Sequence, residues 1–252
     1  MPADGLNSPR VQQRKSGGGG DEKNGSPFPD KYDMRGTRVL SIYKGQITEV
    51  PMEVFEEARQ EKVNVVQLKD NRLGEVPKDL NMLSKLLTQL DLTKNQISYI
   101  PTSMSQFSKL AHFKVPCNLL RDLPMEFGGL QNLCTLDISF NRFERLPRCI
   151  GDLQSLETLL AHDNHIKDID ASEAGLGALK NLQVLDLSHN DIRQVPPILG
   201  NQQNIRELYL MGNPLRQPRH QILSAGTNGI LAFLALASPL HSSSNQIICY
   251  CY

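Results

Sequence analysis

The chain has 252 residues, enough for one large domain or two small ones. Lysine plus arginine and aspartate plus glutamate both number 27, so the net charge is zero and gives no general argument for binding nucleic acid or an anionic membrane. No apolar run reaches membrane-spanning length, and the N-terminus lacks the apolar segment of a secretory signal peptide.

The N-terminal residues are rich in glycine, serine, proline and charged side chains, and they contain almost nothing to bury. We therefore expect residues 1–33 to form a disordered leader, because such a composition cannot offset the entropy of folding. No folded element is predicted before residue 34.

The cysteines bear on the compartment. There are five, an odd number, and none has the spacing of a zinc site. Cys249 and Cys251 lie too close together for a comfortable disulfide. This usage favours a cytoplasmic or nuclear location over an oxidising one.

A short frame recurs along the chain from residue 39. LDISFNRFERLP at 136–147 and LDLSHNDIRQVP at 185–196 share a leucine, an aspartate, a serine, an asparagine and a proline at matching positions. The asparagines recur at intervals of 24, 23, 23, 23, 26 and 23 residues, and they are Asn71, Asn95, Asn118, Asn141, Asn164, Asn190 and Asn213. An earlier, degraded copy, VLSIYKGQITEVP, has Gly45 at the asparagine position. A fixed period in the twenties with the pattern L-x-x-L-x-L-x-x-N predicts leucine-rich repeats.

The physical role of each position in the frame follows from strand geometry. Each L-x-L segment predicts a short strand whose leucines point inward and whose other residues point outward. The asparagine amide is expected to satisfy backbone groups that the next turn leaves unpaired. Stacked repeats share an apolar core that one repeat cannot form alone. We therefore predict an α/β solenoid over residues 34–224, a right-handed leucine-rich repeat horseshoe of about eight repeats with a curved parallel sheet on its concave face.

Three segments depart from the regular repeat. Residues 53–64 and 170–181 belong to longer copies, and we expect true helical turns there on the convex side. After Asn213 the pattern stops, and the apolar residues of 225–238 predict a C-terminal capping helix that covers the last strand. Residues 239–252 are expected to be a disordered tail.

The segment LCTLDISFNRFERLPRCIGDLQSL, at 133–156, carries a family resemblance. It resembles the intracellular leucine-rich repeat class that includes the Ras-group scaffolds and the plant intracellular Ras-group-related proteins. The resemblance extends from about residue 38 to residue 236. It implies a non-enzymatic repeat protein.

Outward strand positions are expected to form columns of neighbours, because parallel strands lie roughly 4.8 Å apart. Toward the C-terminal end these columns become more apolar, and exposed aromatic and methionine side chains are typical of binding hot spots. We predict a partner-binding surface on the concave face formed by Leu160, His162, Asp186, Tyr209 and Met211, with Phe140 nearby. Scattered apolar surface residues are also common, so that simpler interpretation stays open.

Two further features of the columns concern charge and backbone pairing. Lys114 should lie between Asp91 and Asp137, either as a weak exposed charge ladder worth ~0–1 kcal/mol per pair or as a charged strip that contacts a partner. Pro116 falls within an expected strand, where it would remove a hydrogen-bond donor from the ladder.

These patterns predict a scaffold that binds other proteins through its concave face. We expect no cofactor, no nucleic acid, no membrane and a monomeric chain. One alternative is a regulator of a small GTPase or of a phosphatase complex, by analogy with the Ras-group scaffolds. Another is a metal-dependent or hydrolytic enzyme that would need to join His162, Asp163 and His189. We expect His162 and Asp163 to project in different directions, and therefore no metal site.

Overall fold

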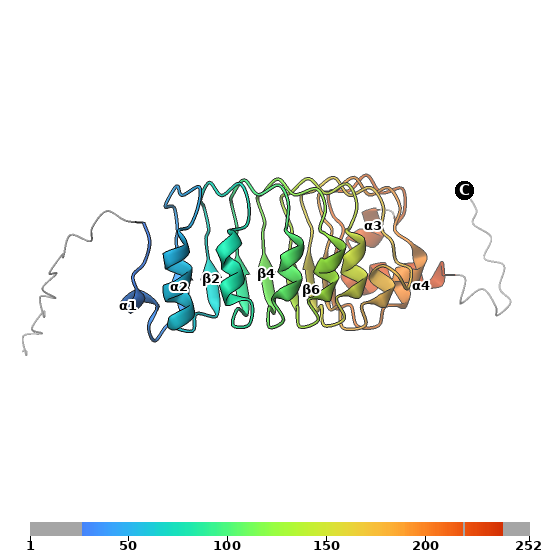
Figure 1. Ribbon diagram of the computed structural model, residues 1–252. Coiled ribbons are helices and arrows are strands. Elements are labelled where there is room, and N and C mark those ends of the chain that lie inside the picture. Colours follow the sequence, from blue (N-terminus) through green and yellow to red (C-terminus); the bar gives the residue numbers. More distant parts are fainter. Residues whose placement is uncertain (1–26, 219, 239–252) are drawn as a thin grey trace, which may run out of the picture.

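The computed structural model describes residues 27–218 and 220–238, and within these ranges the chain winds into a solenoid with one parallel sheet (Figure 1). The sheet has eight strands in chain order, each paired with the strand before and after it. They are β1 Val39–Ser41, β2 Val65–Gln67, β3 Gln89–Asp91, β4 His112–Lys114, β5 Thr135–Asp137, β6 Thr158–Leu160, β7 Val184–Asp186 and β8 Glu207–Tyr209. The predicted leucine-rich repeat solenoid is confirmed.

The apolar core lies directly behind the sheet. The middle residue of every strand is buried, because successive side chains in a strand point to opposite faces. The residue two positions further on is also buried; these residues are Ile42, Leu68, Leu92, Val115, Ile138, Ala161, Leu187 and Leu210. Each repeat therefore adds one layer to a core shared with its neighbours.

The convex side is built mainly from short 3-10 helices. They are η1 Lys78–Leu83, η2 Thr102–Gln106, η3 Met125–Gly129, η4 Arg148–Asp152, η5 Leu176–Ala178 and η6 Pro197–Asn201. A proline immediately precedes η1, η2, η3, η4 and η6. Proline suits the start of a helical turn because its fixed φ matches the turn and the first N–H groups have no intrahelical partner.

One of the two predicted helical segments is a true α-helix. Helix α2, Met52–Gln60, buries Val54, Phe55 and Ala58 against the first two repeats, as their helical spacing predicts. The other prediction, helical turns over 170–181, is wrong: only η5 forms there. Asp170 accepts a hydrogen bond from the backbone of Ser172 at 3.0 Å, and such side-chain bonds compete with helix formation.

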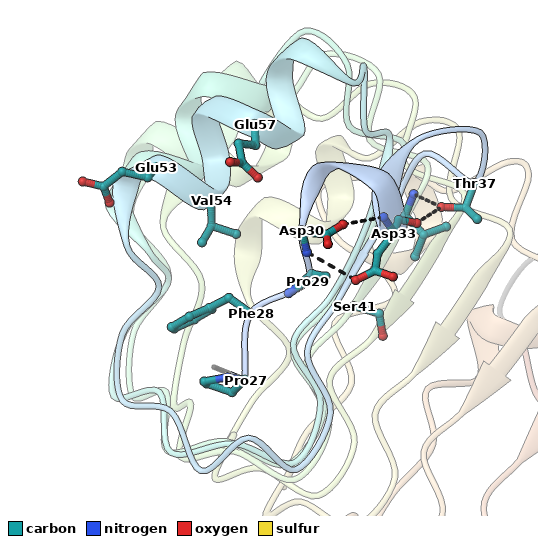
Figure 2. A pocket seen from close by; sticks show the side chains of 11 residues that line it. Pro27, Phe28, Pro29, Asp30, Asp33, Thr37, Ser41, Glu53, Val54 and Glu57 are labelled. Atoms are coloured by element: carbon teal, nitrogen blue, oxygen red, sulfur yellow. Dashed lines mark hydrogen bonds between the residues drawn. The ribbon is translucent and has the colours of Figure 1, made fainter. Parts of the chain in front are cut away.

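The N-terminal end of the solenoid is covered by a short crossing segment. Of the predicted leader, residues 1–26 lie outside the described residues, whereas residues 27–33 run across the first repeat (Figure 2). Phe28 packs against the core, and helix α1, Lys31–Met34, follows it. The Asp30 side chain accepts hydrogen bonds from the backbone N–H groups of Tyr32 and Asp33, which fixes the start of this helix.

Two helices follow the last strand at the C-terminal end. Helix α3, His220–Leu223, leads into helix α4, Gly226–Leu236, whose Ile230 and Leu234 are buried. The Thr227 hydroxyl accepts a hydrogen bond of 2.9 Å from the Leu208 backbone N–H in β8. A side chain at Gly200 in η6 would collide with the backbone of α4, so this glycine permits the close packing. The predicted tail, residues 239–252, lies outside the described residues.

None of the helices in the described ranges has both the length and the apolar composition that a membrane crossing requires.

The turn after each strand contains a residue with left-handed backbone geometry. It directly precedes each asparagine of the repeat, and its φ lies between 51° and 56° at Asp70, Lys94, Cys117, Phe140, Asp163 and His189. Such a φ costs a residue other than glycine roughly 1–2 kcal/mol. The same turn places the N–H of Lys94 2.9 Å from the Pro116 carbonyl oxygen of the next repeat, so pairing between repeats offsets that cost.

We expect Lys94→Val to lower the free energy of unfolding by about 1–2 kcal/mol, because a β-branched side chain fits this backbone region poorly. Lys94 is exposed, so little packing is lost. Gln96→Val is the matched control, since Gln96 is exposed but lies outside the left-handed region; its effect should stay within about 0.5 kcal/mol. Urea midpoints of the two variants provide the measurement, and equal losses would contradict the assignment of strain to position 94.

Candidate partner-binding surface

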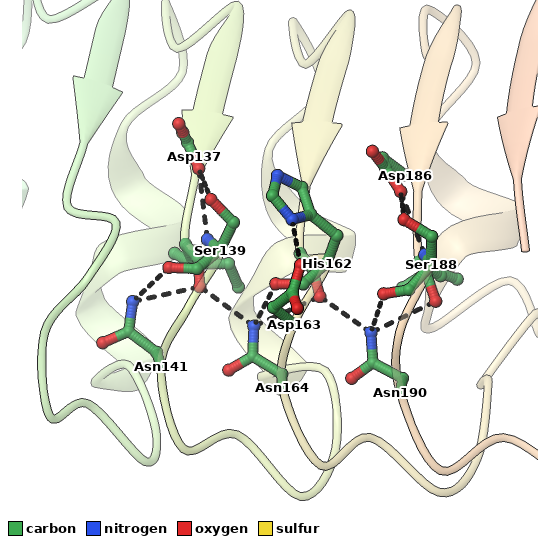
Figure 3. A network of polar contacts seen from close by, with 12 residues as sticks. Asp137, Ser139, Asn141, His162, Asp163, Asn164, Asp186, Ser188 and Asn190 are labelled. Atoms are coloured by element: carbon green, nitrogen blue, oxygen red, sulfur yellow. Dashed lines mark hydrogen bonds and ion pairs between the residues drawn. The ribbon is translucent and has the colours of Figure 1, made fainter. Parts of the chain in front are cut away.

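The concave face is held in shape by the asparagines of the repeat, which we call the Asn ladder: Asn71, Asn95, Asn118, Asn141, Asn164, Asn190 and Asn213. Figure 3 shows three of them, Asn141, Asn164 and Asn190. Asn141 is representative. Its side-chain Nδ2 donates to the carbonyl oxygens of Val115, Ile138 and Ser139, each at 3.0 Å, and its Oδ1 accepts from the Leu120 N–H at 3.0 Å. The amide therefore joins two successive repeats, and it is fully used in doing so.

A second set of polar contacts lies at the end of three strands. Asp91, Asp137 and Asp186 each accept two hydrogen bonds from the residue two positions on, one from its backbone N–H and one from its hydroxyl. For Asp186, these distances from Ser188 are 2.9 and 2.6 Å. One oxygen of Asp186 is thus already occupied, which reduces its capacity as an acceptor for a partner.

This pattern corrects the prediction for Pro116. In the repeats with an aspartate, the backbone N–H at the corresponding position bonds to the aspartate side chain rather than to a neighbouring strand. Strand β4 ends at Lys114, before the proline. Pro116 therefore removes no hydrogen bond from the ladder, and its carbonyl still accepts from the Lys94 N–H.

The predicted binding residues gather at the C-terminal half of the sheet. Leu160 pairs with Asp186, and Asp186 pairs with Tyr209, in adjacent strands. Tyr209 and Met211 are 46% and 64% exposed, and Leu160 is less exposed, being half-buried. These side chains are carried by a rigid sheet, so their separation is set by the strand register.

Phe140 and His162 extend this surface toward β5. Phe140 is 49% exposed, and its ring meets the His162 ring edge-on, with centroids 5.1 Å apart and an interplanar angle of 85°. This geometry favours aromatic pairing and holds both rings in place. We refer to Phe140, Leu160, His162, Tyr209 and Met211 together as the apolar patch.

The prediction that His162 and Asp163 project in different directions is wrong. The His162 Nδ1 lies 2.8 Å from the Asp163 Oδ2, because the left-handed φ of 53° at Asp163 turns its side chain back toward the strand (Figure 3). Simple strand alternation does not apply at this turn. In the described part of the chain, no three histidine, cysteine, aspartate or glutamate side chains come close enough to hold a metal ion.

At the end of the apolar patch, the Tyr209 hydroxyl donates a hydrogen bond of 2.9 Å to the Glu207 carboxylate. This hydrogen bond, together with the negative charge of Glu207, raises the pKa of Tyr209. A phenol is neutral near pH 7 even at its ordinary pKa, so Tyr209 presents an uncharged ring to a partner.

The charged residues Asp91, Lys114 and Asp137 occupy neighbouring strands but do not form the expected ion pairs with one another. The register places Lys114 beside Asp91 and Asp137, as predicted. The ion pair, however, joins Asp91 to Lys69, whose Nζ lies 2.9 Å from the Asp91 Oδ2. A carboxylate already paired with one lysine gains less from a second, so this column is a weak charge ladder.

The three cysteines in the described residues have free thiols. Burial raises the pKa of Cys149 to about 12, and it also raises the pKa values of Cys117 and Cys134. A cysteine nucleophile instead needs a lowered pKa. These thiols therefore behave as packing groups rather than as activated nucleophiles.

The repeat pattern matches established family models. A leucine-rich repeat model matches residues 108–166, and a second model of the same repeat matches residues 181–202. These are leucine-rich repeats.

Two curated proteins are similar over part of the chain. The mouse (Mus musculus) protein named "Leucine-rich repeat and calponin homology domain-containing protein 1" is 31% identical over 108 residues, 43% of this chain and 14% of that protein. Bovine (Bos taurus) osteomodulin is 29% identical over 116 residues, 46% of this chain and 26% of that protein. The alignments thus span only a small part of the length of these relatives.

Solved structures of leucine-rich repeat proteins share the fold. The ectodomain of the Arabidopsis thaliana receptor kinase GASSHO1/SCHENGEN3, solved in complex with CASPARIAN STRIP INTEGRITY FACTOR 2, has a TM-score of 0.59 and 28% identity, covering 69% of this chain and 21% of that one. An internalin of Listeria monocytogenes has a TM-score of 0.60 and 22% identity, covering 72% of this chain and 49% of that one; this likeness concerns the fold alone.

Proposed function

We propose that this chain is a non-catalytic protein-interaction module that binds another protein through the apolar patch on its concave face. The observation that carries the proposal is the exposure of Phe140, Tyr209 and Met211 on a sheet that the Asn ladder holds rigid. Large side chains presented on a rigid surface lose little entropy on binding, and aromatic residues dominate binding hot spots.

The partner suited to this surface has an apolar side chain to place between Leu160 and Tyr209, with a hydroxyl or basic group near Asp186. Ser188 occupies one oxygen of Asp186, which leaves the carboxylate as a polar point among apolar contacts. Complex formation by the GASSHO1/SCHENGEN3 ectodomain is consistent with leucine-rich repeats acting as binding surfaces. The scaffold role in an intracellular assembly rests on this analogy of fold.

We also infer a relationship to the intracellular Ras-group class and, within it, to leucine-rich-repeat-containing protein 40. Support comes from residues 191–223 and from GTNGILAFL at 226–234, which resemble that protein. The free thiols of Cys117, Cys134 and Cys149 agree with a reducing compartment.

Site-specific photo-crosslinking tests the proposed surface. A benzophenone amino acid replaces Tyr209 in one variant and Met125, an exposed residue of η3 on the convex side, in another. After irradiation in cell extract, we expect a discrete adduct from position 209 and none of the same mass from position 125. Adducts formed only from position 125 would place the binding surface on the convex side.

A further inference from the structure

The N-terminal end of the sheet carries a groove that the proposed function does not use. It has a volume of about 920 Å³ and lies between helix α2 and strand β1, beside the crossing segment of residues 27–33 (Figure 2). We call it the edge groove. It lies at the opposite end of the sheet from the apolar patch, so its role can be tested independently.

The groove has an apolar floor and an acidic lining. Phe28, Val39 and Val54 supply the apolar surface. Four carboxylates line the groove, from Asp30, Asp33, Glu53 and Glu57, and none of the described lining residues is lysine, arginine or histidine. Of the two cations close to this segment, Lys31 and Arg35, the Arg35 guanidinium is paired with Glu61 at 3.0 Å. A ligand of this groove therefore needs positive charge beside an apolar group.

The backbone of β1 sets a second, independent requirement for a ligand of this groove. Among the described residues, this strand has a neighbouring strand on one side only, β2. Toward β2, the Arg38 carbonyl accepts from the Val65 N–H and the Ile42 N–H donates to the Gln67 carbonyl. In a parallel ladder the backbone groups of alternate residues face opposite sides, so those of Val39 and Ser41 face outward.

The outward groups of β1 are largely open. The Val39 N–H is taken by the Thr37 hydroxyl at 3.3 Å. The carbonyl of Val39 and both backbone groups of Ser41 have no partner in the described residues. Such an edge is a template for one more strand, and peptide recognition by strand addition uses this kind of edge.

We propose that the edge groove binds an extended peptide segment of a partner protein, which adds to β1 and carries an apolar residue flanked by lysine or arginine two positions away. Alternate residues of a strand share one face, so this spacing directs the apolar and the cationic side chains to the same side. The apolar side chain meets Phe28 and Val54, while the cations meet Glu53 and Glu57.

The test uses the full chain and a defined probe, the capped peptide Ser-Lys-Ser-Val-Ser-Lys-Ser. Two matched peptides accompany it: one with glutamate in place of lysine, and one N-methylated at the amides that would pair with β1. Titration calorimetry at about 0.15 M salt gives Kd. We expect the lysine peptide to bind, and both matched peptides to bind roughly ten-fold more weakly, because one loses the charge match and the other the strand pairing.

Variants of α2 identify the surface without disturbing the core. Glu53→Gln with Glu57→Gln should weaken binding of the lysine peptide roughly ten-fold, whereas Glu56→Gln, exposed on the same helix but outside the groove, should leave Kd within about two-fold. The proposal is overturned if the lysine peptide does not bind, if N-methylation has no effect, or if Glu56→Gln weakens binding as much as the double change.

Two competing occupants of the groove predict different outcomes. The chain's own Arg10, Arg14 and Lys15 also offer cations near an apolar residue, Val11. Much tighter peptide binding after these three cations are replaced by serine would show that the chain's own N-terminal residues occupy the groove. That result would overturn the proposal of a partner peptide. Dimerisation that depends on protein concentration and that the lysine peptide reverses, measured by sedimentation, would assign the groove to a second copy of the chain. It would likewise overturn the proposal of a partner peptide.

Discussion

Replacing Asn141 by alanine is expected to lower the free energy of unfolding by about 3 kcal/mol. The Asn141 amide makes four hydrogen bonds, three donated to carbonyl oxygens and one accepted from the Leu120 N–H, and it is almost fully buried. Alanine leaves those backbone groups unpaired in a space that water does not readily enter, and each buried unpaired group costs ~1–3 kcal/mol.

Two control variants separate this effect from a general response to alanine. Asn132 is the same residue type but exposed, and its side chain makes one hydrogen bond, to the Ser108 carbonyl at 2.7 Å. Asn132→Ala and Lys114→Ala should each cost ~0–1 kcal/mol, because water replaces the lost contact. Urea unfolding midpoints compare the three proteins. Losses of equal size, or a reversed order, would show that the Asn ladder does not stabilise the repeats in this way.

Combining Leu160→Ala with Tyr209→Ala is expected to weaken partner binding by about 2 kcal/mol or more, roughly thirty-fold in Kd, while the unfolding midpoint hardly changes. Both side chains lie on the solvent side of the sheet, and Tyr209 is 46% exposed. The Tyr209 hydrogen bond to Glu207 is also at the surface, so its loss costs folding little. The measurement is the affinity of the protein identified by crosslinking at position 209.

Tyr43→Ala is the control for this double change. Tyr43 is 61% exposed and follows β1, far along the same sheet from the apolar patch, and the Lys44 ammonium lies 5.0 Å from the centre of its ring. The Tyr43→Ala variant should bind the partner with the affinity of the wild type. Full binding by the double variant would mean that the partner uses another surface. Helix α2 is a poor candidate for it around Phe55, because that ring is completely buried.

The sequence by itself determined the repeat, because period and residue type are enough to specify it. A strand with an apolar residue at every second position has one face to bury. An asparagine every 23 to 26 residues marks the turn whose backbone N–H and carbonyl groups need hydrogen-bond partners. The same reasoning predicts a capping helix over 225–238, since the last layer of a stacked core needs a cover. Helix α4, Gly226–Leu236, lies in that segment.

Tertiary structure decided the features that depend on backbone torsions, on close contacts within a loop and on the register of neighbouring repeats. The left-handed turn at Asp163 joins His162 and Asp163, which strand alternation places apart. The Asp186 carboxylate bonds to Ser188, and Asp91 pairs with Lys69 rather than with Lys114. Glycines at 175 and 177, where a side chain would collide with the loop before them, leave residues 170–181 with one short 3-10 turn instead of a helix. The Asp91–Lys69 pair depends on the register of neighbouring repeats, whereas the other outcomes depend on backbone torsions and on close contacts within one loop. Hydrophobic periodicity encodes none of these.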